Sequence, residues 1–336
     1  MKDLEPGYIS LYQSGELERR ARALEARLAA CDICPRECGA NRLEGKVGKC
    51  HSGILPIVAS FCAHRGEEPA LSGSRGSGTI FFGNCNMRCV YCQNFQISQS
   101  PEIQKNNEVS TQVLAERMLY LQNELHCHNI NLVTPSHFVP QIVMAVLEAV
   151  PKGLRLPLVY NTSSYDSVKT LKELDGIISI YLADIRYASN ELGRKYSRAR
   201  NYADNARAAI IEMQRQVGDL TVDKDGIAQK GLIIRHLILP NDIAGSEDSL
   251  RWLVEEVSPH VAVSVMSQYY PTHRACKFKE LNRKILPQEY KKVVDLVEEL
   301  GIENGWLQGM ASAESFRPDF TDKEPFLEGR QRKRRR

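Results

Sequence analysis

Short apolar runs alternate with longer amphipathic stretches along most of this chain. From residue 79 onward, runs of β-favouring residues are each followed by a segment with apolar positions three and four residues apart. The expected strands are 79–82, 130–134, 156–160, 177–185, 232–239, 261–266 and, more weakly, 306–307. The expected helices are 15–30, 111–125, 139–150, 165–174, 201–217, 246–257 and 287–300.

Strands that alternate with helices predict an α/β fold whose parallel sheet is built from βαβ units. Six or seven such units favour a partial or complete (β/α) barrel, although a doubly wound sheet has the same rhythm. Active sites of such barrels lie at the carboxyl ends of the strands. The polar residues that directly follow the apolar runs, such as Asn161 and Gln268, are therefore candidates for the site.

The segment 31–78 differs from the rest because it is rich in Gly and Cys and has little periodicity. We expect a small module whose order depends on bound metal more than on a large core. The predicted organisation is an N-terminal helix (1–30), this Cys-rich module (31–78), the barrel (79–310) and a C-terminal extension (311–336).

Charge argues against a nucleic-acid-binding body. The 336 residues carry a formal net charge of +3, but the last seven residues, from Arg330 to Arg336, contribute six cations. The rest of the chain is therefore slightly acidic, and the tail is expected to be solvated and disordered. No apolar run is long enough to span a bilayer. The N-terminal residues Met-Lys-Asp-Leu-Glu-Pro are not followed by the apolar region of a signal peptide. We therefore expect a cytoplasmic protein without membrane contact.

Seven of the ten cysteines fall in two tight clusters, which in a reducing compartment is more typical of metal binding than of disulfides. The central cluster is Cys85, Cys89 and Cys92, spaced C-x3-C-x2-C directly after the first expected strand. Thiolates favour iron–sulfur clusters or zinc. Structural zinc usually has four protein ligands, whereas three thiolates on a [4Fe–4S] cluster leave one iron open.

This loop, with aromatic Tyr91 before the last cysteine, resembles the signature of the radical S-adenosylmethionine (SAM) superfamily. The likeness covers roughly residues 79–310 and is strongest to the pyruvate formate-lyase activating enzymes and their activating-enzyme-like relatives. It implies that Cys85, Cys89 and Cys92 hold a [4Fe–4S] cluster and that SAM is cleaved reductively to a 5′-deoxyadenosyl radical, which abstracts hydrogen from a substrate. It also implies a reductant such as flavodoxin or ferredoxin.

Further positions carry the same resemblance. Tyr91 corresponds to a residue near the adenine of SAM, and Cys92-Gln93-Asn94 is similar to the activating-enzyme-like group. Asp184-Ile185-Arg186 resembles the D-x-K element, and the run from Arg235 to Pro240 resembles an R-H-x-x-x-P strand. The resulting candidate cofactor-binding residues are Tyr91, Asn94, Ser136, Asn161, Asp184, Arg186, His236 and Gln268.

Two departures limit what the resemblance transfers. Where the family often has Gly-Gly-Glu, this chain has Thr134-Pro135-Ser136-His137, so Ser136 is only a substitute contact for SAM. Arg186 replaces the usual Lys and offers a planar, bidentate donor for a carboxylate.

The N-terminal cluster, Cys31, Cys34, Cys38 and Cys50, has four thiols at metal-site spacing. Four thiolates suit either a closed zinc site or a second iron–sulfur cluster, and the sequence does not choose between them.

Three functions stay open on the sequence. The first is radical activation of a glycyl radical enzyme; the second is radical modification of a peptide or small molecule. The third is an iron–sulfur electron-transfer protein that does not cleave SAM. The substrate, which is a protein in the first case, is not identified.

Overall fold

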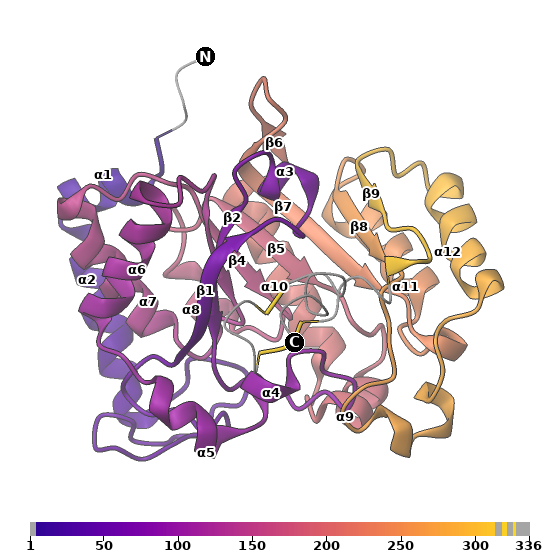
Figure 1. Ribbon diagram of the computed structural model, residues 1–336, viewed down its shortest axis with the longest axis horizontal. Helices are drawn as coiled ribbons and strands as arrows, with labels where there is room; N and C mark the ends of the chain where they lie inside the picture. The colour runs from indigo at the N-terminus through magenta and orange to yellow at the C-terminus, as the bar shows by residue number, and fades with distance from the viewer. Residues whose placement is uncertain (1–4, 313–317, 321–324, 327–336) are drawn as a thin grey trace, which may run out of the picture.

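The computed structural model describes residues 5–312, 318–320 and 325–326. Its nine strands form one sheet in the order β1-β2-β3-β4-β5-β7-β8-β9, with the short β6 paired to β7 (Figure 1). The strands are β1 (Val58–His64), β2 (Ser77–Phe82), β3 (Ile130–Val133), β4 (Leu158–Thr162), β5 (Ile180–Asp184), β6 (Thr221–Val222), β7 (Ala228–Leu237), β8 (Ala262–Met266) and β9 (Gly305–Leu307).

The described helices cover the connections between these strands. They are α1 (Tyr8–Gln13), α2 (Glu16–Ala26), α3 (Pro69–Ser72), α4 (Phe95–Ser98), α5 (Pro101–Gln104), α6 (Thr111–Asn123), α7 (Val139–Ala149), α8 (Val168–Lys172), α9 (Asn190–Ser197), α10 (Tyr202–Val217), α11 (Ser246–Trp252) and α12 (Pro287–Glu299). The expected helix 15–30 is divided into α2 and a 3-10 turn, and α11 continues as a π-turn over Leu253–Val257. Short α9 was not predicted because it has few apolar residues; Ser189 caps it by accepting from the Leu192 amide.

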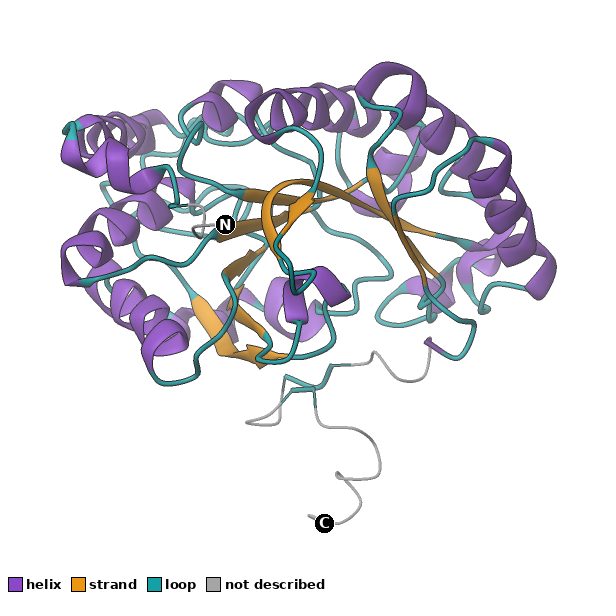
Figure 2. Cartoon of the chain, turned by 90° about the horizontal axis from the view of Figure 1, so that it is seen from above, coloured by secondary structure: helices purple, strands orange, loops and turns teal. Residues whose placement is uncertain are grey.

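The strand order decides between the two predicted architectures. The parallel strands follow one another in chain order, from β2 to β5 and on to β7, β8 and β9, without the reversal that defines a doubly wound sheet. Figure 2 shows the longer helices along the outer side of a curved sheet. A complete barrel does not form, since β1 and β9 are the two edges of the sheet and do not pair with each other within the described chain.

Alternation along the strands separates two apolar layers. One face packs against the helices and includes Ile80, Leu132 and Ile234. The concave face carries a smaller cluster with Val159, Leu182 and Ile233 as neighbours of α3. Successive side chains of a strand point to opposite faces, so neighbours in sequence such as Ile233 and Ile234 enter different layers.

Strand β1 was missed by the sequence pattern. It pairs antiparallel with β2, so the 31–78 segment contributes an edge strand to the main sheet. Most of its side chains are only half-buried, which explains why hydrophobicity did not reveal it. The residues after β1 turn inward, and Ala70 and Leu71 of α3 fill the amino-terminal end of the concave face.

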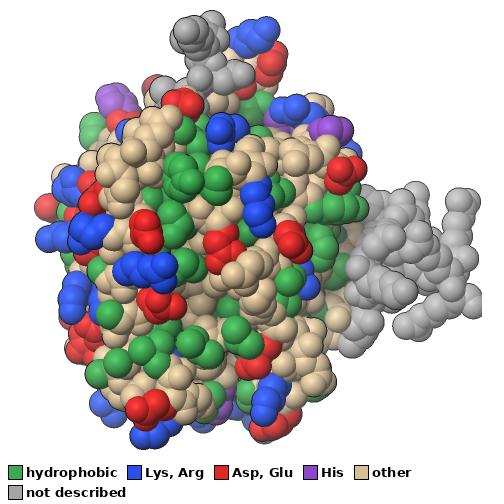
Figure 3. Space-filling model, turned by 90° about the vertical axis from the view of Figure 1, so that its left-hand side faces the viewer, with side chains coloured by type: hydrophobic (Ala, Val, Ile, Leu, Met, Phe, Trp, Pro, Cys, Tyr) green, Lys and Arg blue, Asp and Glu red, His purple; other side chains and the backbone are tan. Residues whose placement is uncertain are grey.

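The surface agrees with a body of balanced charge. On the face drawn in Figure 3, Lys and Arg side chains are interspersed with Asp and Glu side chains. None of the described helices is long and apolar enough to cross a membrane. The basic tail from Arg330 to Arg336 lies outside the described residues.

Candidate functional site at the carboxyl ends of the strands

The loop that bears Cys85, Cys89 and Cys92 leaves the carboxyl end of β2. It begins at Gly83, where a Cβ atom would lie 2.4 Å from Ile57 Cγ2 and 2.6 Å from Gln104 Oε1, so only glycine fits. The amides of Arg88 and Val90 donate to the carbonyls of Ser197 and Tyr196, which end α9. These bonds fix the loop across the end of the sheet.

Each sulfur of the loop has a polar neighbour. Cys89 Sγ accepts from Ser197 Oγ at 3.0 Å and from Arg186 Nη1 at 3.3 Å. Cys85 Sγ accepts from the Met87 amide at 3.3 Å, and Cys92 Sγ lies 3.2 Å from Ser98 Oγ. Burial raises the pKa of Cys85 to about 12, with the neighbouring thiols adding to the shift. The hydrogen-bond donors favour the thiolate form, whereas burial favours the neutral thiol. A bound metal would supply the missing positive charge, and its binding would release protons.

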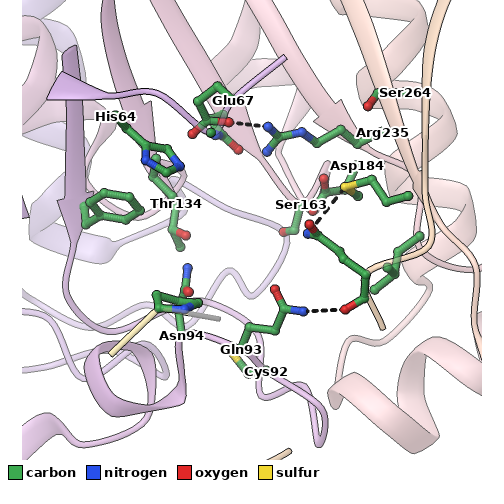
Figure 4. A pocket seen from close by; sticks show the side chains of 18 of the residues that line it. His64, Glu67, Cys92, Gln93, Asn94, Thr134, Ser163, Asp184, Arg235 and Ser264 are labelled. Atoms are coloured by element: carbon green, nitrogen blue, oxygen red, sulfur yellow. Dashed lines mark hydrogen bonds and ion pairs between the residues drawn. The ribbon is translucent and has the colours of Figure 1, made fainter. Parts of the chain in front are cut away.

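The three cysteines line a cavity of about 1640 Å³ on the concave side of the sheet. Six of the eight predicted cofactor-binding residues line the same cavity: Tyr91, Asn94, Asn161, Asp184, Arg186 and Gln268. Figure 4 shows Cys92, Gln93 and Asn94 on one side and Asp184 and Arg235 on the opposite side. The structure thus brings together residues that lie far apart in the sequence, from Cys85 to Gln268.

Asp184 and Arg186 form an ion pair beside the loop. Arg186 Nη2 lies 2.6 Å from Asp184 Oδ2, while Nη1 reaches Cys89. Burial alone would lower the pKa of Arg186, but Asp184 and Cys89 hold it well above its usual value. The pair therefore places a positive and a negative charge next to the cysteines. Such a pair can bind a ligand that carries both a carboxylate and an ammonium group.

Tyr91 and Gln268 have fixed surroundings in the cavity wall. The Tyr91 ring makes edge contacts with Tyr187 and Tyr269, with centroids 6.4 and 5.8 Å apart. The backbone oxygen of Gln268 accepts from Gln93 Nε2 at 3.0 Å, which ties the cysteine loop to the end of β8.

Ser136 and His236 do not line the cavity. Ser136 is buried, and its Oγ lies 3.2 Å from Thr162 Oγ1. His236 is fully buried on the helix-facing side of β7, between Ile185 O and Ser246 Oγ. Burial lowers its pKa to about 4, so the ring is neutral: Nδ1 donates to the carbonyl and Nε2 accepts from the hydroxyl. The structure therefore places these two candidates apart from the six that line the cavity.

Strand alternation explains why His236 lies away from the cavity. Its neighbour Arg235 is the residue that points into the cavity, where it pairs with Glu67 and makes two bonds of 2.7 and 2.6 Å to Glu68. Asp184 lies opposite Arg235 in the paired strands β5 and β7, so both side chains point to the concave face of the sheet. No pattern pointed to Glu67 and Glu68, because the loop that carries them follows the unpredicted strand β1.

The N-terminal cysteines lie beside the central loop, outside the cavity lining. Cys31, Cys34 and Cys50 are buried and Cys38 is half-buried; all ten cysteines of the chain are free thiols. Arg36 Nε donates to Asn86 O at 2.8 Å, and Arg88 Nη2 donates to Lys49 O at 3.3 Å. Among the described residues, no three His, Cys, Asp or Glu side chains are arranged around a single metal ion.

Comparison with known proteins gives little functional information. No model of a known protein family matches the chain. An uncharacterized protein of Methanocaldococcus jannaschii is 28% identical over 285 residues, which are 81% of this chain and 75% of the relative. This likeness spans most of both chains and supplies no activity to transfer.

Proposed function

We propose that this chain is a radical SAM enzyme of the activating-enzyme-like kind, with a partial (β/α) barrel. The observation that carries the proposal is the joint placement of Cys85, Cys89 and Cys92 with Asp184 and Arg186 on one cavity. Three thiols from one loop suit a [4Fe–4S] cluster with one open iron. Cys62, which lines another part of the cavity wall, has Cys127 and Glu67 as its electrostatic neighbours rather than the loop cysteines.

The donor chemistry of the cavity fits both the cluster and SAM. The cluster, when bound and reduced, supplies the electron that cleaves SAM to methionine and the 5′-deoxyadenosyl radical. Arg186 is the candidate partner for the carboxylate of SAM, and Asp184 for its ammonium group. Tyr91 is the candidate contact for adenine, and Asn94, Asn161 and Gln268 supply further polar groups.

The proposal includes a reductant of the flavodoxin or ferredoxin type and a location in the cytoplasm, where clustered thiols stay reduced. Hydrogen abstraction from a glycyl radical enzyme, from another peptide or from a small molecule is compatible with the cavity. Arg186 in place of Lys, and the Thr134–His137 loop in place of Gly-Gly-Glu, set the chain apart from the activases.

The test is anaerobic. The protein is reconstituted with iron and sulfide, reduced and mixed with SAM, and 5′-deoxyadenosine is measured by mass spectrometry beside Cys89→Ala. Deoxyadenosine that depends on Cys89 supports the proposal. If a protein with an intact cluster forms none, alone or with cell extract that supplies substrate, the electron-transfer alternative is favoured.

A further inference from the structure

The four N-terminal thiols lie near one another, and three of them are buried. Cys34 has Cys50 and Cys31 among its electrostatic neighbours, and Cys31 has Cys38. A Cβ atom on Gly48 would lie 2.9 Å from Cys38 Sγ and 3.7 Å from Cys50 Sγ, so both sulfurs approach the same glycine. Segments 31–38 and 48–50 thus bring their sulfurs together.

A buried cation adjoins these sulfurs. Arg42 is fully buried, and its Nη1 lies 3.9 Å from Cys31 Sγ while it donates to His137 O. Its Nη2 is buried and has no hydrogen-bond partner within the described chain. An unsatisfied buried N–H beside four thiols fits an anionic group with additional acceptors.

The unsatisfied guanidinium of Arg42 favours an iron–sulfur cluster over zinc. A zinc ion with four thiolate ligands has a closed coordination shell and offers only the thiolate sulfurs as acceptors. A [4Fe–4S] cluster also takes four thiolates, one on each iron, and its bridging sulfides offer further acceptors to Arg42 Nη2.

One side chain joins the two cysteine clusters. The Asn86 amide hydrogen-bonds to Cys34, and Asn86 Oδ1 lies 3.8 Å from Cys85 Sγ. The charges of both Cys85 and Cys50 act on the guanidinium of Arg88. The sulfurs of Cys34 and Cys85 each contact the side-chain amide of Asn86 at up to about 4 Å. The two sulfurs therefore lie within roughly 10 Å of each other.

We propose that Cys31, Cys34, Cys38 and Cys50 hold a second iron–sulfur cluster that relays electrons to the cluster at Cys85, Cys89 and Cys92. A flavodoxin- or ferredoxin-type protein gives one electron to the N-terminal cluster, which then passes it to the central cluster and returns to its oxidised form. Only the destination of the electron rests on the proposed function; the second cluster does not.

The first experiment asks what the N-terminal cysteines bind. The triple variant Cys85→Ala, Cys89→Ala, Cys92→Ala is purified anaerobically, with Cys276→Ser as a control for loss of an exposed cysteine elsewhere. Iron, acid-labile sulfide and zinc are measured per chain, and EPR spectra are recorded after reduction. Retained iron and sulfide with a cluster signal support the proposal. Zinc in their place, or a folded protein without metal, overturns it.

The second experiment tests the relay without measuring SAM cleavage. In Cys38→Ser, the bleaching of the central cluster's absorbance is followed after mixing with reduced flavodoxin and, separately, with dithionite. We expect flavodoxin to reduce it about 10-fold more slowly than in the unsubstituted protein, and dithionite at an unchanged rate. Unchanged flavodoxin rates, or equal slowing by both reductants, overturn the relay.

Discussion

The two cysteine clusters are neighbours in space but differ in what surrounds them. Cys85, Cys89 and Cys92 line a large cavity, whereas Cys31, Cys34, Cys38 and Cys50 do not. The central loop offers three thiols, with an ion pair of Asp184 and Arg186 beside one of them. The N-terminal segments offer four thiols and the buried side chain of Arg42. Three ligands on a cavity suit chemistry on a bound molecule, and four ligands away from it suit a closed site.

The origin of the ligands also differs. The central loop is anchored to α9 and to the end of β8, so the main sheet and its helices set the position of the loop. The N-terminal ligands come from short turns with little secondary structure, and glycine at position 48 leaves the room that they need. A bound group is therefore expected to contribute more to local order at the N-terminal cluster.

The sharpest test of the comparison removes one thiol from each cluster. Cys89→Ala deletes a ligand on the cavity and should lower 5′-deoxyadenosine formation by more than about 100-fold. Cys38→Ala should leave most dithionite-driven SAM cleavage intact, because its sulfur does not line the cavity. Both variants are assayed by mass spectrometry after iron analysis. Equal loss in the two variants would contradict the division into separate sites.

Arg186→Ala should weaken SAM binding at the central site. It removes the guanidinium that joins Asp184 to Cys89. Arg186 is the proposed partner of the SAM carboxylate, and loss of one partner of a partly buried charge pair across a binding site typically costs about 2 kcal/mol, so affinity should fall roughly 30-fold. Isothermal titration with SAM measures the change, and Arg186→Lys is the matched variant that keeps the charge. Unaltered affinity in both would remove Arg186 from the binding site.

Gly48→Ala adds a methyl group beside the N-terminal cysteines without removing a thiol. The new methyl group would collide with Cys38 Sγ at 2.9 Å, so we expect a loss of about 1–3 kcal/mol in the free energy of unfolding and lower metal content at this cluster. Gly53→Ala is the control, since a Cβ there meets nothing within 4 Å. Denaturant unfolding measures the stability of both variants, and metal analysis measures how much metal each one binds. A stable Gly48→Ala protein with full metal content would refute the crowding argument.

His236→Gln should have the smallest effect on the chemistry. The imidazole bonds to Ile185 O and Ser246 Oγ on the helix-facing side of β7. Disturbing these buried bonds should cost about 1–3 kcal/mol of folding stability while leaving SAM affinity unchanged. Thermal unfolding and SAM titration are read side by side. A large drop in SAM affinity from a stably folded variant would show that His236 acts on the cavity after all.

The sequence by itself determined the α/β class, most of the parallel strands and the spacing of Cys85, Cys89 and Cys92 within one loop. These features are local: periodicity of apolar residues sets element type, and ligand spacing within one loop survives any tertiary arrangement. It also indicated Asp184 and Arg186 through their resemblance to the D-x-K element, and their place at the end of a parallel strand agrees with a position at the carboxyl edge of the sheet.

Only the tertiary structure decided what depends on strand pairing and on distant segments. It selected consecutive winding over a doubly wound sheet, left the sheet open between β1 and β9, and added edge strand β1. It assigned Arg235 to the cavity and His236 to the helix-facing layer, because a strand sends adjacent residues to opposite faces and the pattern alone does not say which face is concave. It also brought Cys34 into contact with Asn86 beside Cys85, although the two residues are 52 positions apart in the sequence and no local pattern predicts the contact.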